Sequence, residues 1–183
     1  MQSPKIDNGF LTVYSNEIDV QHWIDLINKI DKSCYPFERV ERRPHETMML
    51  PNFFCKTDSV EAIELRNLFL GVLGKYMDKY ILDHEITSLE PYQQFIAISR
   101  LSPYQSMGAH RDTQDENSKG FIIMLYINDD YVNGELSFPE KNYIYKPAAG
   151  DIAIYPMREP HAVEHTTLGI RYTIGCGFKS PIA

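Results

Sequence analysis

The chain has 183 residues, a length that suits one folded domain able to bury about 70% of its unfolded surface. Its net charge of -7 argues against a nucleic-acid backbone as the main partner, and a hydrophobic fraction of 43% with 12 tyrosines argues against disorder. Three widely spaced cysteines without a CxxC pair argue against a disulfide framework or a zinc module. The sequence has neither a basic and apolar leader nor an apolar run of about 18 residues, so it predicts a cytoplasmic protein without a membrane partner.

The first ninety residues are predicted to be mainly helical. Residues 9–14 have the composition of a strand, after which apolar side chains recur at helical spacing over residues 20–30, with Asp19 as a candidate cap. We expect this helix to pack on a sheet. Residues 58–61 have the form of a capping box, and one apolar stripe continues from there to Tyr80, which predicts a second helix.

Residues 33–56, between these helices, contain three prolines and show no clear period, so they are predicted to form a long loop. Two interpretations stay open. A loop of this length inside a compact domain is often functional, and here Arg42 and Arg43 could offer charge, and Phe53 and Phe54 aromatic surface, to a substrate peptide. The alternative is an ordered segment that wraps over the core.

From Gln93 onward short strands alternate with turns, the pattern of an antiparallel sandwich or barrel. We therefore expect one α+β domain over residues 1–183, with residues 1–90 as mainly helical support and residues 91–180 as a β core that carries the functional site. The polar residues 113–119 are predicted to form a loop at the mouth of this core, where substrate recognition is common.

A chelating pair stands at His110 and Asp112. Side chains two residues apart at a strand end point to the same side, so both can bind one ion. Because 6 histidines and 25 acidic residues give roughly 0.8 such triplets by chance, the pair needs a third ligand to be specific. His161 and His165 both qualify, since they share one face of a later strand. Two imidazoles and one carboxylate leave three sites open on an octahedral metal, which suits iron(II) and O2 chemistry. The other histidines are predicted to be structural or surface residues: His22, His45 and His84.

The last predicted strand, residues 170–178, has one large and one small face. Its period of two places Arg171, Thr173 and two glycines on the small face. A core strand would normally bury larger side chains there, so this face predicts room for a small anion beside Arg171. An arginine can hold a carboxylate through two parallel hydrogen bonds.

These motifs and their surroundings resemble the 2-oxoglutarate/Fe(II)-dependent dioxygenases, and within them the prolyl-4-hydroxylase-like branch. The resemblance runs from about Gln93 to Phe178. It is carried by the His-Arg-Asp triplet and by five flanking segments: residues 98–103, 121–128, 133–138, 147–156 and 169–172. It implies a double-stranded β-helix, which is a jelly-roll or cupin-like barrel, with the N-terminal helices packed on its sheet.

The resemblance also implies the metal ligands. His161 is then the third ligand beside His110 and Asp112, because the distal histidine of relatives follows a Gly-Asp-strand-Pro segment and precedes a basic residue. His165 then occupies a position where relatives often have proline. The implied cofactors and co-substrates are Fe(II), 2-oxoglutarate and O2, with ascorbate as a further cofactor.

Three residues are implied to bind the co-substrate. Arg171 and Tyr126 would hold the distal carboxylate of 2-oxoglutarate, and Thr173 would add a hydroxyl donor. The chain departs from the family's pattern near the first histidine, where a tyrosine of prolyl hydroxylases is replaced by Arg100-Leu101 and an aromatic residue by Met107. Tyr104, in the same turn, is the candidate replacement for the lost tyrosine.

The implied reaction is hydroxylation of an unactivated C–H bond, coupled to the conversion of 2-oxoglutarate to succinate and CO2. A prolyl residue of a protein or peptide is the first candidate substrate, and a free amino acid or other small molecule is the second. Because Asp112 is retained, a halide has no vacant ligand site and halogenation is disfavoured. Two other classes stay open. A cupin-like metal-binding module would not need Arg171, and a zinc hydrolase would need a general base that the pattern does not identify.

Overall fold

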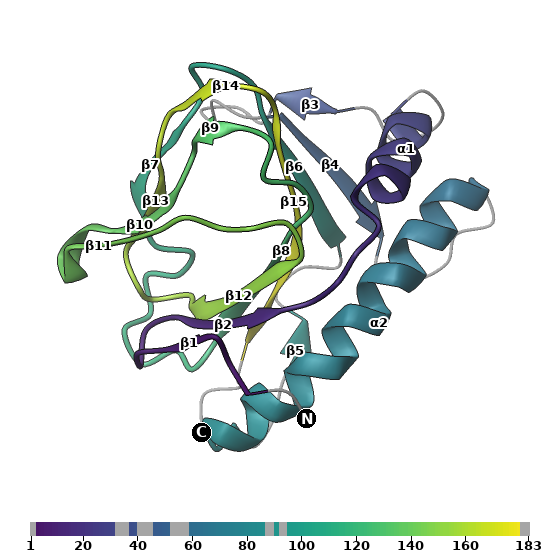
Figure 1. The fold of residues 1–183 in the computed structure, drawn as a ribbon. Helices are drawn as coiled ribbons and strands as arrows, with labels where there is room; N and C mark the ends of the chain where they lie inside the picture. Colours follow the sequence, from purple (N-terminus) through teal and green to yellow (C-terminus); the bar gives the residue numbers. More distant parts are fainter. Residues whose placement is uncertain are drawn as a thin grey trace.

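The computed structural model describes residues 3–31, 37–39, 46–51, 59–86, 90–91 and 95–179. Two helices lie on one side of a large sheet, and a small sheet faces the other side of it (Figure 1). The helices are α1 (Val20–Asp31) and α2 (Val60–Asp83), and a short 3-10 helix covers Pro139–Lys141. The strands are β1 (Ile6–Asp7), β2 (Thr12–Ser15), β3 (Glu38–Arg39), β4 (Glu46–Pro51), β5 (Glu90–Pro91), β6 (Phe95–Leu101), β7 (Met107–His110), β8 (Phe121–Tyr126), β9 (Val132–Asn133), β10 (Leu136–Phe138), β11 (Tyr143–Tyr145), β12 (Asp151–Pro156), β13 (His161–Val163), β14 (Thr166–Leu168) and β15 (Arg171–Lys179).

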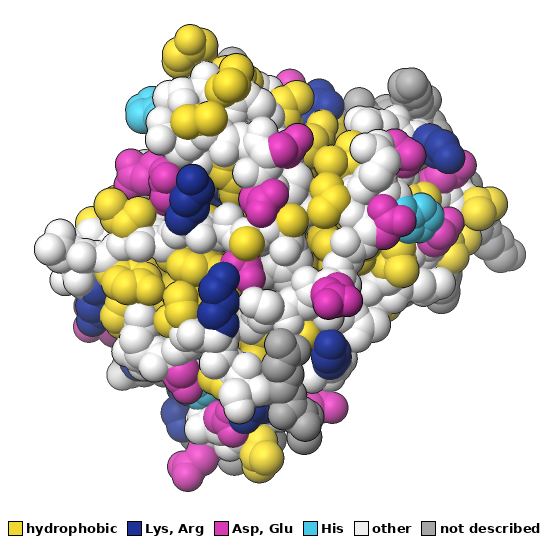
Figure 2. All heavy atoms as spheres, in the orientation of Figure 1, with side chains coloured by type: hydrophobic (Ala, Val, Ile, Leu, Met, Phe, Trp, Pro, Cys, Tyr) yellow, Lys and Arg dark blue, Asp and Glu magenta, His cyan; other side chains and the backbone are white. Residues whose placement is uncertain are grey.

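The described strands pair in antiparallel fashion. The large sheet has the order β1-β2-β12-β8-β15-β6-β4-β3, and β5 pairs with β15. The small sheet has the order β11-β10-β13-β7, and β14 and β9 form a separate two-stranded ribbon. Hydrophobic side chains gather at the top of Figure 2, over this ribbon, where the cross-strand partners Val132 and Leu168 are both exposed.

Each of the two α-helices begins with a side-chain cap. The Asp19 carboxylate accepts a hydrogen bond from the His22 amide at 3.0 Å, as expected of an N-cap at α1. At α2 the cap is Ser59, whose hydroxyl accepts from the Ala62 amide at 3.2 Å. The predicted capping box began one residue earlier, at Asp58, which lies outside the described residues. Neither helix is both long and apolar enough to cross a lipid bilayer.

Two hydrophobic clusters lie on the two faces of the large sheet. The first joins the buried faces of α1 and α2 to the outer face of the sheet, and it includes Trp23, Phe69 and Ile98. The second lies between the large and small sheets, and it includes Tyr126 and Phe138. Burial of this apolar surface holds the helices on the sheet and orders the inner face that carries the site.

Besides α1 and α2, the first ninety residues contain β1 to β4, which join the large sheet. The long loop predicted at residues 33–56 contains β4, which pairs with β6 along six consecutive residues. Thr47, Met48 and Leu50 are buried there. A strand this short shows no reliable period by itself, and pairing with β6 supplies its hydrogen bonds. Residues 42–43 and 53–54 lie outside the described part of the chain.

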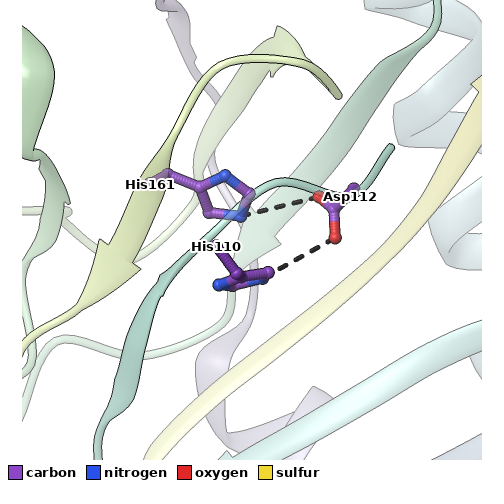
Figure 3. Close-up of side chains that lie close together, drawn as sticks. All are labelled: His110, Asp112 and His161. Atoms are coloured by element: carbon purple, nitrogen blue, oxygen red, sulfur yellow. Dashed lines mark ion pairs between the residues drawn. The ribbon is translucent and has the colours of Figure 1, made fainter. Parts of the chain in front are cut away.

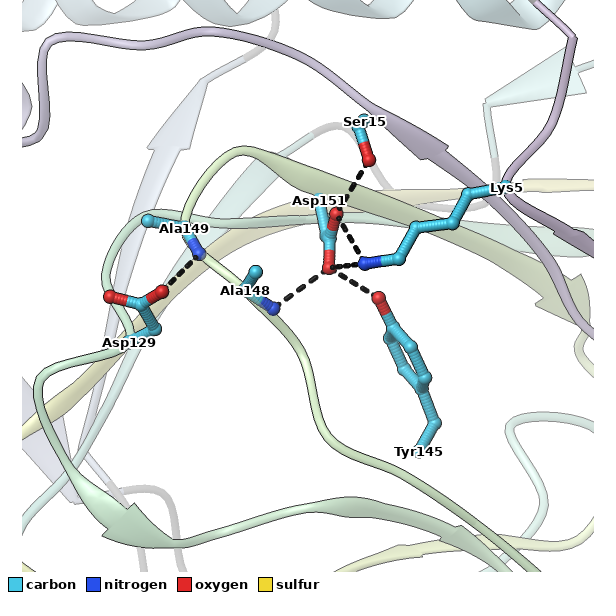
Figure 4. A network of polar contacts seen from close by, with 7 residues as sticks. All are labelled: Lys5, Ser15, Asp129, Tyr145, Ala148, Ala149 and Asp151. Carbon is cyan, nitrogen blue, oxygen red and sulfur yellow. Dashed lines mark hydrogen bonds and ion pairs between the residues drawn. The ribbon is translucent and has the colours of Figure 1, made fainter.

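A buried polar network ties the N-terminal segment to β12 (Figure 4). The Asp151 carboxylate is almost fully buried and accepts hydrogen bonds from Lys5 Nζ at 3.1 Å, Ser15 Oγ at 3.1 Å and the Ala148 amide at 2.7 Å. It also accepts one from the Tyr145 hydroxyl. Four donors from separate segments therefore satisfy one buried charge.

Gly150, just before this aspartate, has a φ of 84°, which favours glycine, and a Cβ there would lie 1.9 Å from the Asn16 carbonyl oxygen. The close approach of the two backbones lets the Asn16 amide donate to the Gly150 carbonyl at 3.1 Å.

Candidate metal centre and adjoining cavity

Three side chains with metal-binding atoms converge where the small sheet meets the loop that follows β7 (Figure 3). His110 ends β7 and His161 begins β13, and the two residues lie directly opposite each other in the strand pair. Asp112 follows β7 by two residues, and its amide donates to the Met157 carbonyl at 2.9 Å. The potential ligand atoms all lie within 4.8 Å of one another, and no other such group occurs in the described part of the chain.

Backbone hydrogen bonds set the tautomer of both imidazoles. His110 Nδ1 lies 2.9 Å from the Gly108 carbonyl oxygen, and His161 Nδ1 lies 3.0 Å from the Glu159 carbonyl oxygen. A carbonyl only accepts, so each Nδ1 donates a proton and each Nε2 carries a lone pair. These Nε2 atoms face the Asp112 carboxylate, at 3.7 Å from His110 and 3.5 Å from His161. Converging lone pairs fit a divalent cation.

His161 is the more deeply placed of the two imidazoles. Burial lowers its pKa, the nearby Asp112 charge opposes that shift, and His110 adds to it. Its ring packs 4.7 Å from the ring of Tyr155, measured between centroids. A neutral and sterically held imidazole is the form that binds a metal.

A cavity of about 120 Å³ opens beside these residues, enough for several water molecules or a small ligand. Its lining includes the small face of β15, namely Arg171, Thr173, Gly175 and Gly177, so the predicted hollow is present. The space over Gly175 is not empty, since a Cβ there would lie 2.9 Å from the sulfur of Met124. This methionine also lines the cavity.

Arg171 lies at the large-sheet side of the cavity and is only 3% exposed. Its guanidinium carbon lies 4.9 Å from the centre of the Tyr126 ring, and its Nε has no hydrogen-bond partner among the described residues. Burial raises the pKa of Tyr126, and the Arg171 charge opposes that shift. Thr173 is directly opposite Tyr126 in the sheet. The three residues expected to bind a co-substrate therefore share one end of the cavity.

Tyr131 was not expected at this position. It is buried close to Arg171 without lining the cavity, and burial raises its pKa to about 12, against the opposing effect of Arg171. It comes from the turn before β9, which carries no metal or carboxylate motif, so no sequence signal marked it.

Several sequence candidates lie away from the cavity. His165 is exposed, and His22 pairs with Glu64 at 2.9 Å. His84 is exposed as well, and His45 lies outside the described residues. Tyr104 is 81% exposed and does not line the cavity, so it does not replace the missing tyrosine.

At the positions where prolyl hydroxylases carry aromatic side chains, Leu101 and Met107 line the cavity with apolar atoms. The loop over residues 113–119 directly follows Asp112 and is held in part by Arg158, whose Nη1 donates to the Glu116 carbonyl at 3.1 Å. The structure therefore places this loop next to the metal-binding group.

No sequence-based family model matches the chain, and no curated protein matches it in sequence. Solved structures do match. The viral collagen prolyl hydroxylase of Paramecium Bursaria Chlorella virus-1, in its 2-oxoglutarate complex, is 15% identical with a TM-score of 0.67, over 96% of this chain and 98% of that one. The chain has the fold of the 2-oxoglutarate and iron(II) oxygenases.

Two further structures with this fold act on different kinds of molecule. A prolyl hydroxylase from Trichoplax adhaerens, in complex with a peptide of hypoxia inducible factor, is 13% identical with a TM-score of 0.66, over 94% of this chain and 84% of that one. The non-heme alpha-ketoglutarate-dependent carbocyclase SnoK of nogalamycin biosynthesis is 13% identical with a TM-score of 0.65, over 93% of this chain and 79% of that one. The likeness therefore extends over nearly the whole chain but does not separate the two substrate classes.

Proposed function

We propose that this chain is an iron(II)- and 2-oxoglutarate-dependent oxygenase that hydroxylates an unactivated C–H bond. The observation that carries the proposal is the pairing of a His-Asp-His group with a buried arginine at the other end of one cavity. A cupin-like metal-binding module would need the first feature only. The double-stranded β-helix that we propose for the two facing sheets would place both features inside the barrel.

His110, Asp112 and His161 would hold the iron through two neutral imidazoles and one carboxylate. Bound iron(II) supplies the oxidation, in which O2 and 2-oxoglutarate yield succinate, CO2 and one hydroxyl group on the substrate. The rest is done by the protein. The Gly108 and Glu159 carbonyls keep the Nε2 atoms unprotonated, so that both lone pairs are available to the metal.

Arg171 would bind the carboxylate of 2-oxoglutarate that lies farther from the metal. Its guanidinium is buried and lies over the Tyr126 ring, and its Nε has no hydrogen-bond partner among the described residues. Tyr126 and Thr173 would add hydroxyl donors, because both line the cavity in neighbouring strand positions. A buried carboxylate held by charge-assisted hydrogen bonds gains both orientation and affinity.

A prolyl residue of a protein or peptide is the substrate that we propose first, supported by the likeness to two prolyl hydroxylases. A free amino acid or another small molecule is the second candidate, because the carbocyclase matches about as well. The cavity is small, so either substrate would present only its reacting carbon to the metal and bind mainly outside the cavity.

The test has two stages. The protein loaded with Mn(II) should bind 2-oxoglutarate in calorimetry, and the protein loaded with iron(II) should release succinate when it is incubated with extract of its host cell. Mass spectrometry should then find products that carry one added oxygen atom, in peptides or in small molecules. His161→Ala should lose metal binding and turnover, while the matched His165→Ala variant retains both. Absence of 2-oxoglutarate binding by the metal-loaded protein would refute the proposal.

A further inference from the structure

Tyr155 is a cavity-lining residue to which neither the motifs nor the proposed function gives a role. It lies on β12, its side chain is buried, and its ring packs between His161 and Phe138, at centroid distances of 4.7 and 5.8 Å. A phenylalanine would fill the same space. The hydroxyl group is therefore the part of this side chain that packing leaves unexplained.

The strand register places Tyr155 at the opposite end of the cavity from Arg171. Tyr126, Thr173 and Ser99 form one row across β8, β15 and β6, next to the arginine. Tyr155 pairs instead with Ile122, four residues back along β8. Four residues of strand span roughly 13 Å. By backbone register, the hydroxyl-bearing residues of the cavity therefore fall into a row beside Arg171 and Tyr155 nearer the metal-binding group, although the charges of Arg171 and Tyr126 still act on the Tyr155 hydroxyl.

The far end is the end with the metal-binding group. Besides the ring contact with His161, the amide of Asp112 bonds to the carbonyl of Met157, two residues beyond Tyr155. A tyrosine has an ordinary pKa of about 10, so the Tyr155 hydroxyl keeps its proton at neutral pH. No hydrogen bond from the described residues reaches it. Tyr155 therefore offers a free donor beside the metal ligands.

A 2-oxo acid chelates a metal through its oxo group and one oxygen of the adjoining carboxylate. The second oxygen of that carboxylate stays without a partner unless the protein provides a donor, and a buried unsatisfied acceptor is costly. Leu101 and Met107, which line the cavity, carry no hydroxyl. We infer that the Tyr155 hydroxyl donates a hydrogen bond to the metal-end carboxylate of the bound 2-oxo acid. This assignment rests on the proposed function.

Binding of two different ligands distinguishes the contributions of the two ends of the site. 2-Oxoglutarate has a carboxylate at each end, whereas 2-oxobutyrate keeps the metal-binding end and lacks the distal carboxylate. Dissociation constants of both ligands would be measured by calorimetry on protein saturated with Mn(II), for the wild type and for Tyr155→Phe, Arg171→Met and Tyr172→Phe. The last variant is the control, because Tyr172 is a buried tyrosine of the cluster on the outer face of the sheet.

Tyr155→Phe should weaken both ligands by the same factor, about 10-fold or more, which is the effect of losing a hydrogen bond to a charged group. Arg171→Met should weaken 2-oxoglutarate only, and Tyr172→Phe should leave both ligands unchanged. The Mn(II) affinity of Tyr155→Phe should equal that of the wild type. In addition, the visible charge-transfer absorption of the anaerobic complex of iron(II) and 2-oxoglutarate should shift in Tyr155→Phe and stay in place in Tyr172→Phe.

Three results would overturn the assignment. Unchanged affinity for 2-oxobutyrate in Tyr155→Phe would show that the hydroxyl does not act at the metal end. Loss of Mn(II) affinity in that variant would show that Tyr155 holds His161 instead. Failure of the wild type to bind either ligand would refute the proposed function together with this inference. If the wild type binds both ligands and Tyr155→Phe binds them with the same affinity, only the inference is refuted.

Discussion

Replacement of Arg171 by methionine tests the proposed co-substrate site most directly, because methionine keeps much of the length and removes the charge. In the ligand-free protein two effects of this change oppose each other. Loss of the contact with the Tyr126 ring costs about 0.5–2 kcal/mol. Removal of a buried Nε without a partner returns about 1–3 kcal/mol. We therefore expect the Tm of the ligand-free variant to stay within a few degrees of the wild type.

The response to 2-oxoglutarate should differ strongly between the two proteins. A ligand present at 100 times its Kd stabilises the folded state by about 2.7 kcal/mol. For a chain of 183 residues that corresponds to a rise in Tm of roughly 5–11 °C. Loss of charge-assisted hydrogen bonds worth about 1.5–3 kcal/mol weakens binding roughly 10- to 150-fold. At a 100-fold loss the same ligand concentration equals Kd, and the stabilisation falls to about 0.4 kcal/mol, or roughly 1 °C.

The assay is thermal unfolding of Mn(II)-loaded protein with and without 2-oxoglutarate. Mn(II) alone should shift both proteins equally, since Arg171 is not a metal ligand. Arg171→Lys should lie between the two, because the charge stays but the planar fork is lost. If Arg171→Met kept the full 2-oxoglutarate shift of the wild type, the reasoning about this arginine would be wrong.

Three other predictions concern the metal group and the fold. Alanine at His110, Asp112 or His161 should abolish Mn(II) and iron(II) binding in a metal titration. Alanine at His165 is the control and should leave metal binding intact, because that residue is exposed. Tight metal binding by the His161→Ala variant would contradict the geometry. Burial lowers the pKa of His161 in the folded protein below the value of about 6.5 in the unfolded chain. Between these two pKa values the unfolded chain binds more protons than the folded protein. The free energy of unfolding of the metal-free protein should therefore fall as the pH drops through this range. Urea denaturation of the wild type and of His161→Gln between pH 7 and pH 5 would measure this, and the free energy of unfolding should depend less on pH in the variant. An equal pH dependence in both proteins would show that other groups cause the effect. Asp151→Ala should destabilise the fold by about 3–5 kcal/mol in the same assay, because it removes the buried carboxylate to which four groups donate hydrogen bonds. A loss below about 1 kcal/mol would show that the network is dispensable.

The metal group was the part of the site that sequence reasoning could approach best. His110 and Asp112 are close in sequence, so a local rule about strand ends is enough to pair them. The choice between His161 and His165 came from family resemblance, and in the structure it is His161 that lies opposite His110. Local geometry alone could not make this choice, because both residues lie on one face of the same predicted strand.

Features that depend on long-range pairing were beyond the sequence. Strand β4 gains its hydrogen bonds from β6, almost fifty residues later in the chain, and its own residues show too little periodicity to reveal it. Tyr155 lines the cavity and Tyr131 lies close to Arg171 because of packing against distant strands, and a tyrosine in a strand or a turn is unremarkable by itself. The filling of the space over Gly175 by Met124 likewise follows from strand register and not from spacing within β15.

The metal-binding group and Arg171 belong to different sheets. His110 and His161 lie on the small sheet, whereas Arg171 and Tyr126 lie on the large one. A co-substrate held at both ends would act as a cross-link between two layers that also meet through side-chain packing and through the hydrogen bond from Tyr145 to Asp151. Exchange of backbone amide hydrogens in β13 and β15 would then slow together when metal and 2-oxoglutarate are both bound, and the protein would be at its most rigid only once the proposed co-substrate is in place.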